Sequence, residues 1–425
     1  MESNILAKKI ENGEYDEKLK RLYGDAKAGS ARRRYIGALE NFTALYGAGD
    51  VEIISVPGRS EVLGNHTDHN RGRVLAAAID LDIIAVVSKN PAPRIKIKSE
   101  GFEPDEINIE ELAARESEKF TSSAIIRGTC ARFDNLGHRI GGFDAYTASD
   151  VQKGSGLSSS AAFEVTVGFI LNRLYNDARL PPLEIAQIGQ YAENNYFGKP
   201  CGLMDQTACS AGGFISIDFR DPASPIVEKL DFDLSKSGYS VCIVSTGGSH
   251  HDKNDEYAAM PGEMRQIAAY FKKDALREVD KAAFAENIGK LRESCGDRAV
   301  LRSMHYFAEN ARVHAGAEAL KEGDFEKFLQ LVASSGNSSY KYLQNVYDPA
   351  TPKEQGLSLA LALSEEALAK IPAAARVHGG GFSGTIQAFV PKKHVDGYFK
   401  KIGGVFGELS CLELSVRNEG AIAVM

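Results

Sequence analysis

A glycine-rich turn followed by a run of serines stands at residues 154–160, directly before a helix-like pattern. Apolar residues recur at helical spacing from Leu157 to Tyr175, which predicts a helix there. The serines therefore stand where a helix begins, and backbone N–H groups at that end have no partner inside the helix. Glycines let the chain approach a ligand closely, and the helix dipole favours negative charge. The stretch is typical of an anion cradle, and we expect it to hold nucleotide phosphates. A serine-capped turn without a ligand is the alternative.

Ionisable and amide side chains crowd between two predicted strands at residues 59–70. The strands are expected over 51–56 and about 74–88, with a turn at Pro57-Gly58. Polar groups held in this way suggest a binding site for a small polyhydroxy or charged ligand. Two alternatives are a solvated turn and a metal site at His66, Asp68 and His69, although this spacing fits no common zinc site.

Two acidic residues stand out between the cradle and residue 210. A strand over 143–149 is expected to deliver the chain into the cradle, and a later helix over about 183–196 carries Glu193. A glycine-containing break at 198–202 precedes Asp205, which lies in a mainly apolar neighbourhood. Asp205 is either a helix cap or a positioned carboxylate. A strand over 241–245 and a helix containing Tyr257 follow.

A second glycine cluster, His378-Gly379-Gly380-Gly381-Phe382-Ser383-Gly384, superficially matches the G-x-G-x-x-G fingerprint of dinucleotide-binding proteins. That fingerprint must open a helix, whereas residues 385–390 alternate like a strand and stop at Pro391. We therefore interpret the cluster as a glycine hairpin or loop that lets backbone approach a ligand. No G-x-x-x-x-G-K-[ST] phosphate loop occurs in the sequence.

The composition limits the classes of function. A chain of 425 residues favours two domains, and 43% hydrophobic with 25% charged residues is typical of a soluble globular protein. A net charge of -7 gives no electrostatic footprint for nucleic acid or an anionic membrane. The six cysteines form no C-x-x-C pair, and the N-terminus lacks the apolar segment of a signal peptide, so we expect a cytoplasmic protein.

Four motifs together resemble the kinase superfamily of galactokinase, homoserine kinase, mevalonate kinase and phosphomevalonate kinase (GHMP), and within it the galactokinase branch. They are PGRSEVLGNHTDHNRG, GSGLSSSAA, CGLMDQ and HGGGFSG, from residue 57 to beyond 380. The resemblance implies an α/β (α+β) fold with an N-terminal mixed-sheet domain over 1–215 and a C-terminal antiparallel α+β domain over 216–425. Residues 1–48 would be a helical extension. The active site would lie in the cleft between the domains.

The resemblance also implies a reaction and its residues. The reaction is ATP-dependent phosphorylation of the C1 hydroxyl of a galactose-type sugar, by a monomer that needs Mg²⁺. Asp205 would be the catalytic carboxylate, either removing the proton or stabilising the oxygen, and Arg59 its cationic partner. Ser160 and Glu193 would hold Mg²⁺. The nucleotide phosphates would meet Gly154, Ser155, Gly156, Leu157, Ser158, Ser159 and Ser160. The sugar would meet Arg59, Asn65, His66, Asp68, Gly202, Asp205 and Tyr257.

The chain departs from the family pattern near the far end of the sugar. Galactokinases usually carry Glu where this chain has Asn65, and Tyr where it has His69. A neutral Asn65 would remove a like-charge penalty against a C6 carboxylate. Galacturonate and N-acetylgalactosamine are therefore alternative substrates, and a sugar sensor without catalytic activity on the same fold is a more remote alternative.

Overall fold

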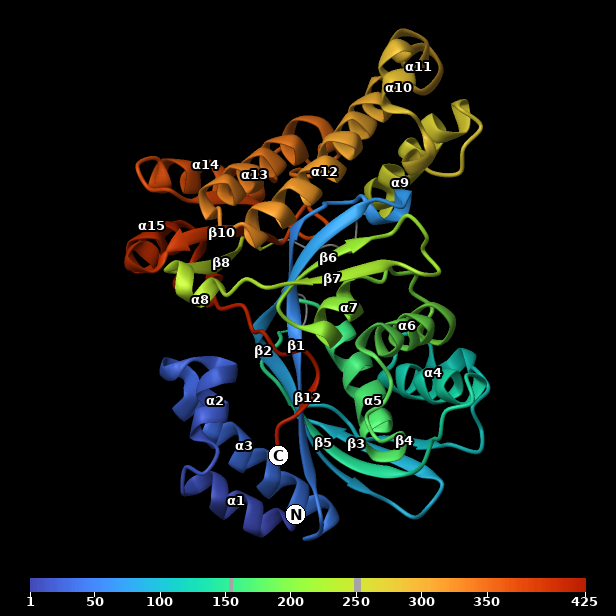
Figure 1. The fold of residues 1–425 in the computed structure, drawn as a ribbon, viewed down its shortest axis with the longest axis vertical. Helices are drawn as coiled ribbons and strands as arrows, with labels where there is room; N and C mark the ends of the chain where they lie inside the picture. Colours follow the sequence, from blue (N-terminus) through green and yellow to red (C-terminus); the bar gives the residue numbers. More distant parts are fainter. Residues whose placement is uncertain (153–155, 248–253) are drawn as a thin grey trace.

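Two sheets organise the computed structural model, which describes residues 1–152, 156–247 and 254–425 (Figure 1). The first sheet is mixed: β3 pairs with β5 in parallel, and its other pairings are antiparallel. Its path runs β12-β1-β2-β5-β3-β4, with β6 on β2 and β7 on β6. The strands are β1 (Glu52–Leu63), β2 (Arg73–Lys89), β3 (Arg94–Ser99), β4 (Asp105–Asn108), β5 (Phe143–Ser149), β6 (Phe214–Asp218), β7 (Ile226–Leu230) and β12 (Ile422–Ala423).

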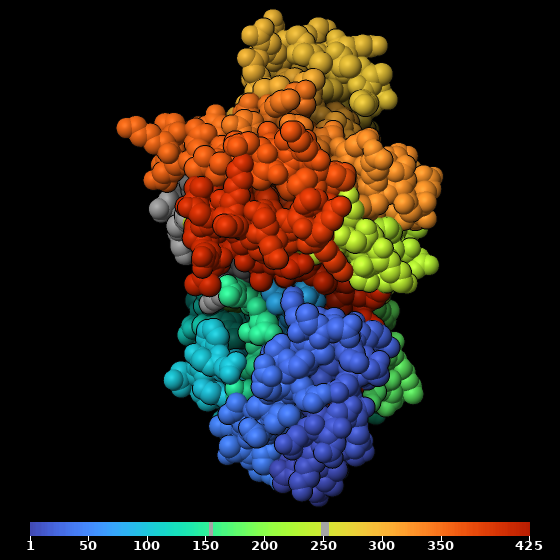
Figure 2. All heavy atoms as spheres, turned by 90° about the vertical axis from the view of Figure 1, so that its left-hand side faces the viewer, coloured from blue at the N-terminus to red at the C-terminus, as the bar shows by residue number. Residues whose placement is uncertain are grey.

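Helices cover both faces of this sheet. Alternate residues of β2 enter two separate cores: Ile83, Ala85 and Val87 pack with one group of helices, and Ile84 and Val86 with the other. The first group is α4 (Ser122–Asn135), α5 (Ser159–Tyr175), α6 (Pro182–Ala192) and α7 (Met204–Ala211). The second group is α1 (Ser3–Glu11), α2 (Asp16–Tyr23) and α3 (Asp25–Tyr46). The N-terminal segment is therefore helical, as predicted, and Figure 2 shows it in blue below the red C-terminal segments.

The second sheet is entirely antiparallel, in the order β11-β8-β10-β9. Its strands are β8 (Tyr239–Ser245), β9 (Ala374–His378), β10 (Thr385–Pro391) and β11 (Cys411–Leu414). The accompanying helices are α8 (Leu234–Ser237), α9 (Asn254–Tyr270), α10 (Lys281–Glu286), α11 (Ile288–Cys295), α12 (Asp297–Lys321), α13 (Phe325–Ser338), α14 (Gly356–Leu368) and α15 (Val395–Phe406). Short 3₁₀ or π-helical turns are η1 (Asp68–Asn70), η2 (Glu116–Glu118), η3 (Glu193–Phe197), η4 (Leu276–Glu278), η5 (Ser339–Leu343), η6 (Lys392–His394) and η7 (Glu408–Ser410).

The two sheets share one hydrophobic core. Val62 and Leu75 from the first sheet pack in the same cluster as Val241 and Phe389 from the second. This confirms the predicted fold class, a mixed sheet followed by an antiparallel α+β unit. The division at residue 215 stays a prediction, and it falls inside β6, whose pairing with β2 continues to Asp218. No helix in the described part of the chain is long and apolar enough to cross a membrane.

The predicted turn at Pro57-Gly58 is wrong, because β1 runs straight through it to Leu63. Pro57 has no N–H to donate, and a proline inside a sheet is tolerated at a bulge. The pairing with β2 shifts register between Pro57 and Arg59 and again between Glu61 and Leu63. Residues 59–63 are therefore strand, and only the later part of the polar stretch forms a turn, which contains η1.

A buried carboxylate fastens the N-terminal helices to the first sheet. Asp82 on β2 is 0% exposed. It accepts hydrogen bonds from Arg34 on α3 (2.6 Å) and Arg417 near the C-terminus (3.1 Å), and also from Tyr23 and Ser55. Burial opposes ionisation, but the two guanidinium groups outweigh it, so the pKa of Asp82 is lowered. One side chain thus connects α2, α3, β1 and the C-terminal segment.

Replacing Arg417 with methionine should destabilise the protein strongly. The substitution removes a cation from a carboxylate that stays buried, and breaking such a pair costs about 3–5 kcal/mol. Denaturant unfolding of Arg417→Met against the parent measures this change. Arg21→Met is a matched control, since Arg21 is 61% exposed and pairs with Glu419 at 2.6 Å; it should cost under about 1 kcal/mol. Equal losses in the two variants would contradict the assignment.

Candidate active site

A two-bond ion pair between Arg59 and Asp205 lies at the centre of the site. Arg59 comes from β1 and Asp205 from the first turn of α7. The guanidinium Nε lies 2.8 Å from Asp205 Oδ1, and Nη2 lies 2.7 Å from Oδ2. The Arg59 side chain is 9% exposed and that of Asp205 32%. Burial alone would lower the pKa of Arg59, but the Asp205 carboxylate outweighs it and the pKa is raised. The guanidinium is fixed, while its carboxylate partner remains open to a ligand.

The same pair contacts the serine turn before α5. Arg59 Nη1 donates to the Gly156 carbonyl at 2.6 Å, and the Arg59 backbone N–H donates to Leu157 O at 3.1 Å. Ser158 has a left-handed backbone (φ +60°), uncommon for a residue other than glycine, and its hydroxyl donates to Asp205 Oδ2. A Cβ on Gly58 would lie 2.7 Å from Leu157 O, so only glycine lets β1 pass this close.

The predicted phosphate cradle is only partly described. Ser158 stands at the N-terminal end of α5, whose first two residues are Ser159 and Ser160. The backbone N–H groups of this end are thus placed as the sequence predicts for an anion site. Gly154 and Ser155 lie outside the described residues.

The glycine hairpin between β9 and β10 closes this side of the site. A Cβ on Gly156 would come within 3.3–3.4 Å of Thr385 Oγ1 and His378 Nδ1. The His378 ring lies 3.0 Å from both Ser60 and Thr385 oxygens. Burial, with Arg59 nearby, lowers the pKa of His378 to about 3, so the ring is neutral at pH 7. Three motifs that are far apart in the sequence therefore meet around Gly156.

Asp68 and Gly202, both predicted sugar contacts, lie against each other. A Cβ on Gly202 would lie 2.4 Å from Asp68 Oδ2, so a larger residue would displace this carboxylate from its present position. His69 Nδ1 donates to Asp68 Oδ1 at 2.9 Å. Burial opposes ionisation, but the bond from His69 lowers the pKa of Asp68 to about 2. Asp68 is therefore an ionised acceptor in a partly exposed turn.

Three other predicted sugar contacts hold the glycine hairpin. Asn65 Nδ2 donates to Gly379 O (2.8 Å), His66 Nε2 to Gly380 O (2.9 Å) and Tyr257 Oη to Gly381 O (2.8 Å). Burial and the neighbouring His69 lower the pKa of His66 to about 4, so the ring is neutral at pH 7. In this structure these side chains position the hairpin through its carbonyls.

Asn65 is the most enclosed of them, at 0% exposed. Its second N–H donates to Glu61 Oε1 at 2.9 Å. Its carbonyl oxygen accepts from Asn345 Nδ2 at 2.8 Å and from Ser339 Oγ at 3.3 Å. An amide side chain has two donors and one acceptor oxygen, so all its hydrogen-bonding groups are used inside the protein.

A pocket of about 530 Å³ opens beside the serine turn. It brings together the predicted metal residues Ser160 and Glu193, with Ser159 and Glu164, and aromatic side chains that sequence analysis gave no role. These are Phe102, Phe120, Phe163 and Phe197. Phe120 is 69% exposed and meets Phe197 edge to face at 5.6 Å. The aromatic residues come from separate segments without a motif, so no signal in the sequence indicated them.

Carboxylates at the inner end of this pocket fit a hard cation. Glu193 (3% exposed) begins the π-helical turn η3, and such turns are frequent at functional sites. Glu164 Oε1 is buried and has no hydrogen-bond partner among the described residues. Burial first, and then the charge of Glu193, raises the pKa of Glu164 well above its usual value. Among the described residues, no group of three or more His, Cys, Asp or Glu side chains is arranged so that it could hold a metal ion by itself. Magnesium is usually held by one or two carboxylates together with phosphate oxygens and water, so these residues suit it.

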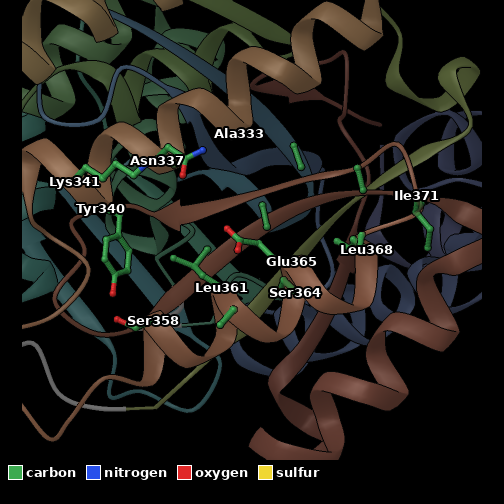
Figure 3. Close-up of a pocket in the computed structure, with 16 residues that line it drawn as sticks. Ala333, Asn337, Tyr340, Lys341, Ser358, Leu361, Ser364, Glu365, Leu368 and Ile371 are labelled. Carbon is green, nitrogen blue, oxygen red and sulfur yellow. The ribbon is translucent and has the colours of Figure 1, made fainter.

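A second cavity, of about 550 Å³, lies between α13, α14 and β9 (Figure 3). Lys341 and Glu365 are among its polar residues, and small residues such as Gly336 form part of its wall. It contains none of the predicted site residues, so it is separate from the site around Asp205.

Comparisons with known proteins agree with this arrangement. Residues 40–89 match the model of the galactokinase galactose-binding signature, and residues 124–213 match that of the GHMP kinases N terminal domain. A galactokinase from Streptomyces coelicolor is 32% identical over 374 residues, which cover 86% of this chain and 92% of that protein. A galactokinase from Actinobacillus pleuropneumoniae is 31% identical over 371 residues, or 84% and 90% of the two chains.

Solved structures share the fold. The Lactococcus lactis galactokinase complexed with galactose superposes with a TM-score of 0.75 at 24% identity, covering 90% of this chain and 98% of that one. The Methanococcus jannaschii mevalonate kinase gives 0.60 at 16% identity, covering 87% and 99%. The relatives that are 32% and 31% identical in sequence identify the chain as a member of the galactokinase family, the sugar kinases of the GHMP superfamily.

Proposed function

We propose that this protein transfers the γ-phosphoryl group of ATP to the C1 hydroxyl of galactose. The observation that carries the proposal is the Arg59–Asp205 pair. Arg59 contacts the serine turn through the carbonyl of Gly156. Asp205 stands at the start of α7, shortly after Gly202 in the sequence, and Gly202 lies against Asp68. In this proposal the serine turn receives the phosphates, and Asp68 accepts hydrogen bonds from the sugar hydroxyls. Relatives that carry the name galactokinase support galactose as the sugar.

Asp205 is the residue that accepts the hydroxyl proton. Two N–H bonds from Arg59 and one O–H bond from Ser158 fix the plane of the carboxylate. Oδ1 receives only one of these bonds, so it keeps a lone pair for the C1 hydroxyl. The partial exposure of the side chain lets that hydroxyl approach. Holding an acid–base group in this way is what general base catalysis requires.

Arg59 stabilises negative charge while the phosphoryl group moves. Its guanidinium is held by Asp205 and Gly156 O before substrate binds, so little reorganisation is needed during the reaction. Ser160 and Glu193 would hold Mg²⁺, which when bound supplies charge neutralisation to the phosphate oxygens. The exposed ring of Phe120 and its neighbour Phe197 fit the flat faces of an adenine.

Galactose would bind on the Asp68 side of the pair. Asp68 is an ionised acceptor, and charge-assisted hydrogen bonds to sugar hydroxyls are strong. His66 and Tyr257 position the hairpin on the same side. Six free cysteines suit a reducing compartment, the cytoplasm.

An ADP-release assay over a panel of sugars tests the proposal. Galactose with MgATP should give turnover, and removal of divalent cations with EDTA should abolish it until Mg²⁺ is restored. Galacturonate and N-acetylgalactosamine should react more slowly. A preference for either of them would overturn the substrate, and galactose binding without any ADP release would indicate a sensor.

Replacing Asp205 with asparagine should remove the general base and keep the size and shape of the side chain. We expect kcat to fall about 10²–10⁴-fold, the range for a positioned acid–base group. Galactose affinity, measured by calorimetry, should change little. A kcat within about threefold of the parent, far below that range, would make Asp205 a helix cap.

Replacing Arg59 with lysine keeps the charge but loses the planar fork that bonds Asp205 and Gly156 O together. We expect kcat to fall about 10²–10³-fold, as for other preorganised electrostatic groups. Steady-state kinetics with galactose and MgATP measure it. A raised KM with an unchanged kcat would instead assign Arg59 to ground-state binding.

Replacing Asn65 with aspartate distinguishes a role in holding the glycine hairpin from a role in discriminating between sugars at C6. An aspartate carboxylate would face Glu61 and Gly379 O without a proton to donate, so we expect a loss of about 2–4 kcal/mol in stability. Galactose KM should rise as the hairpin loosens, and the galactose-to-galacturonate ratio of kcat/KM should stay the same. Thermal unfolding and kinetics on both sugars test this. A changed ratio at unchanged stability would instead support the sequence-based prediction that residue 65 discriminates at C6.

A further inference from the structure

One amide connects two buried carboxylates beneath the nucleotide pocket. Gln206 Nε2 lies 2.8 Å from Glu164 Oε2 and 3.2 Å from Glu193 Oε2. The exposed fractions of Glu164, Glu193 and Gln206 are 0%, 3% and 1%. An NH₂ group has two hydrogens, and the two carboxylates are nearer acceptors than Cys201 Sγ, which lies 3.5 Å from the same nitrogen.

The chemistry fixes which way the amide points. With the opposite orientation, the Gln206 oxygen would face the Glu193 carboxylate, which has no hydrogen to donate to it. With the NH₂ group toward them, Oε1 of Gln206 and Oε1 of Glu164 remain without a hydrogen-bond partner among the described residues. Fully buried polar atoms are rarely left in this state unless a site uses them. Gly189 on α6 keeps the cluster tight, because a Cβ there would lie 3.1 Å from Glu164 Cβ.

Three elements of the site meet at this amide. Glu164 lies on α5, the helix that begins at the serine turn. Glu193 begins η3, and Gln206 follows Asp205 on α7. The Gln206 amide therefore connects Glu193, the carboxylate assigned to the metal, with two helices. These are α7, which bears the proposed base, and α5, which begins at the serine turn.

We propose that Glu164 and Gln206 are positioning residues for the metal–nucleotide complex: Glu164 accepts one N–H of Gln206, which leaves the other N–H directed at Glu193 and fixes its carboxylate toward the pocket. This inference rests on the proposed function, since it requires that Glu193 holds the cation. Partners that orient a metal ligand in this way typically contribute 10–100-fold to metal affinity.

Matched substitutions test whether Glu164 acts as the hydrogen-bond acceptor for Gln206. Glu164→Gln keeps an oxygen that can accept from Gln206, whereas Glu164→Met and Gln206→Met break the connection. The experiment measures Mn²⁺ binding to the protein in the presence of ADP. Binding is monitored through the electron paramagnetic resonance signal of free Mn²⁺. We expect the two methionine variants to bind Mn²⁺ about 10–100-fold more weakly, and Glu164→Gln to stay within about threefold of the parent. Gln187→Met on α6 is the control, because the Gln187 amide donates to Ala223 O at an exposed position. The Mn²⁺ affinity of this variant should equal that of the parent.

Galactose affinity without nucleotide, and the melting temperature, separate positioning from unfolding. The methionine variants should keep galactose affinity within about twofold, because these substitutions act on the orientation of the metal ligand and not on the sugar contacts. Parallel losses of galactose and Mn²⁺ affinity, or a loss in Glu164→Gln as large as in Glu164→Met, would overturn the inference. Should the parent bind Mn²⁺ and ADP but release no ADP from ATP with galactose, the proposed function fails while the inference stands. Unchanged Mn²⁺ affinity in the methionine variants of an active parent overturns only the inference.

Discussion

A guanidinium that is almost completely removed from water must find partners for its donors, and in this protein that requirement sets the geometry of the site. Arg59 meets it with both oxygens of Asp205 and the carbonyl of Gly156. Leaving such a charge without partners would cost several kcal/mol. The start of α7, the turn before α5 and the second half of β1 therefore have to come together. The same contacts that stabilise the buried cation also orient the carboxylate that we assign to the chemistry.

Polar residues in the site divide into those that stay open to a ligand and those that hold backbone. Asp205 and Asp68 are carboxylates with exposed surface in partly open positions. Asn65, His66 and Tyr257 instead use donors on successive carbonyls of the hairpin at 379–381. The hairpin carries many glycines because neighbouring backbone and rings leave little room: a Cβ on Gly381 would lie 2.0 Å from Asn345 O. Precise placement of a flexible glycine segment thus depends on side chains from the turn after β1 and from α9.

Stability and catalysis rely on separate buried charges. Asp82 joins the N-terminal helices, β1 and the C-terminal segment with two arginines, and it is not itself one of the residues that line the pocket. Glu164 and Glu193 lie beside the pocket, with a single amide between them. In the first cluster the carboxylate is paired with two guanidinium groups inside the protein. The second keeps unpartnered oxygens, which is the property expected where a cation arrives with its ligand.

The sequence alone determined the features that depend on short-range spacing. Helical periodicity after the serine run predicted α5, alternation predicted β5, β8 and β10, and a following strand excluded a dinucleotide fingerprint at the second glycine cluster. Four motifs in order were enough to predict the fold class and the family. The tertiary structure decided what depends on contacts between distant segments. Bulges carried β1 through Pro57, separate segments brought four phenylalanines to one pocket, and Asn65 was enclosed by residues up to 314 positions away. Local periodicity records which face of an element is buried, but the partners of a buried polar group are set by packing across the whole chain, so the roles of Asn65 and Glu164 emerged only in three dimensions.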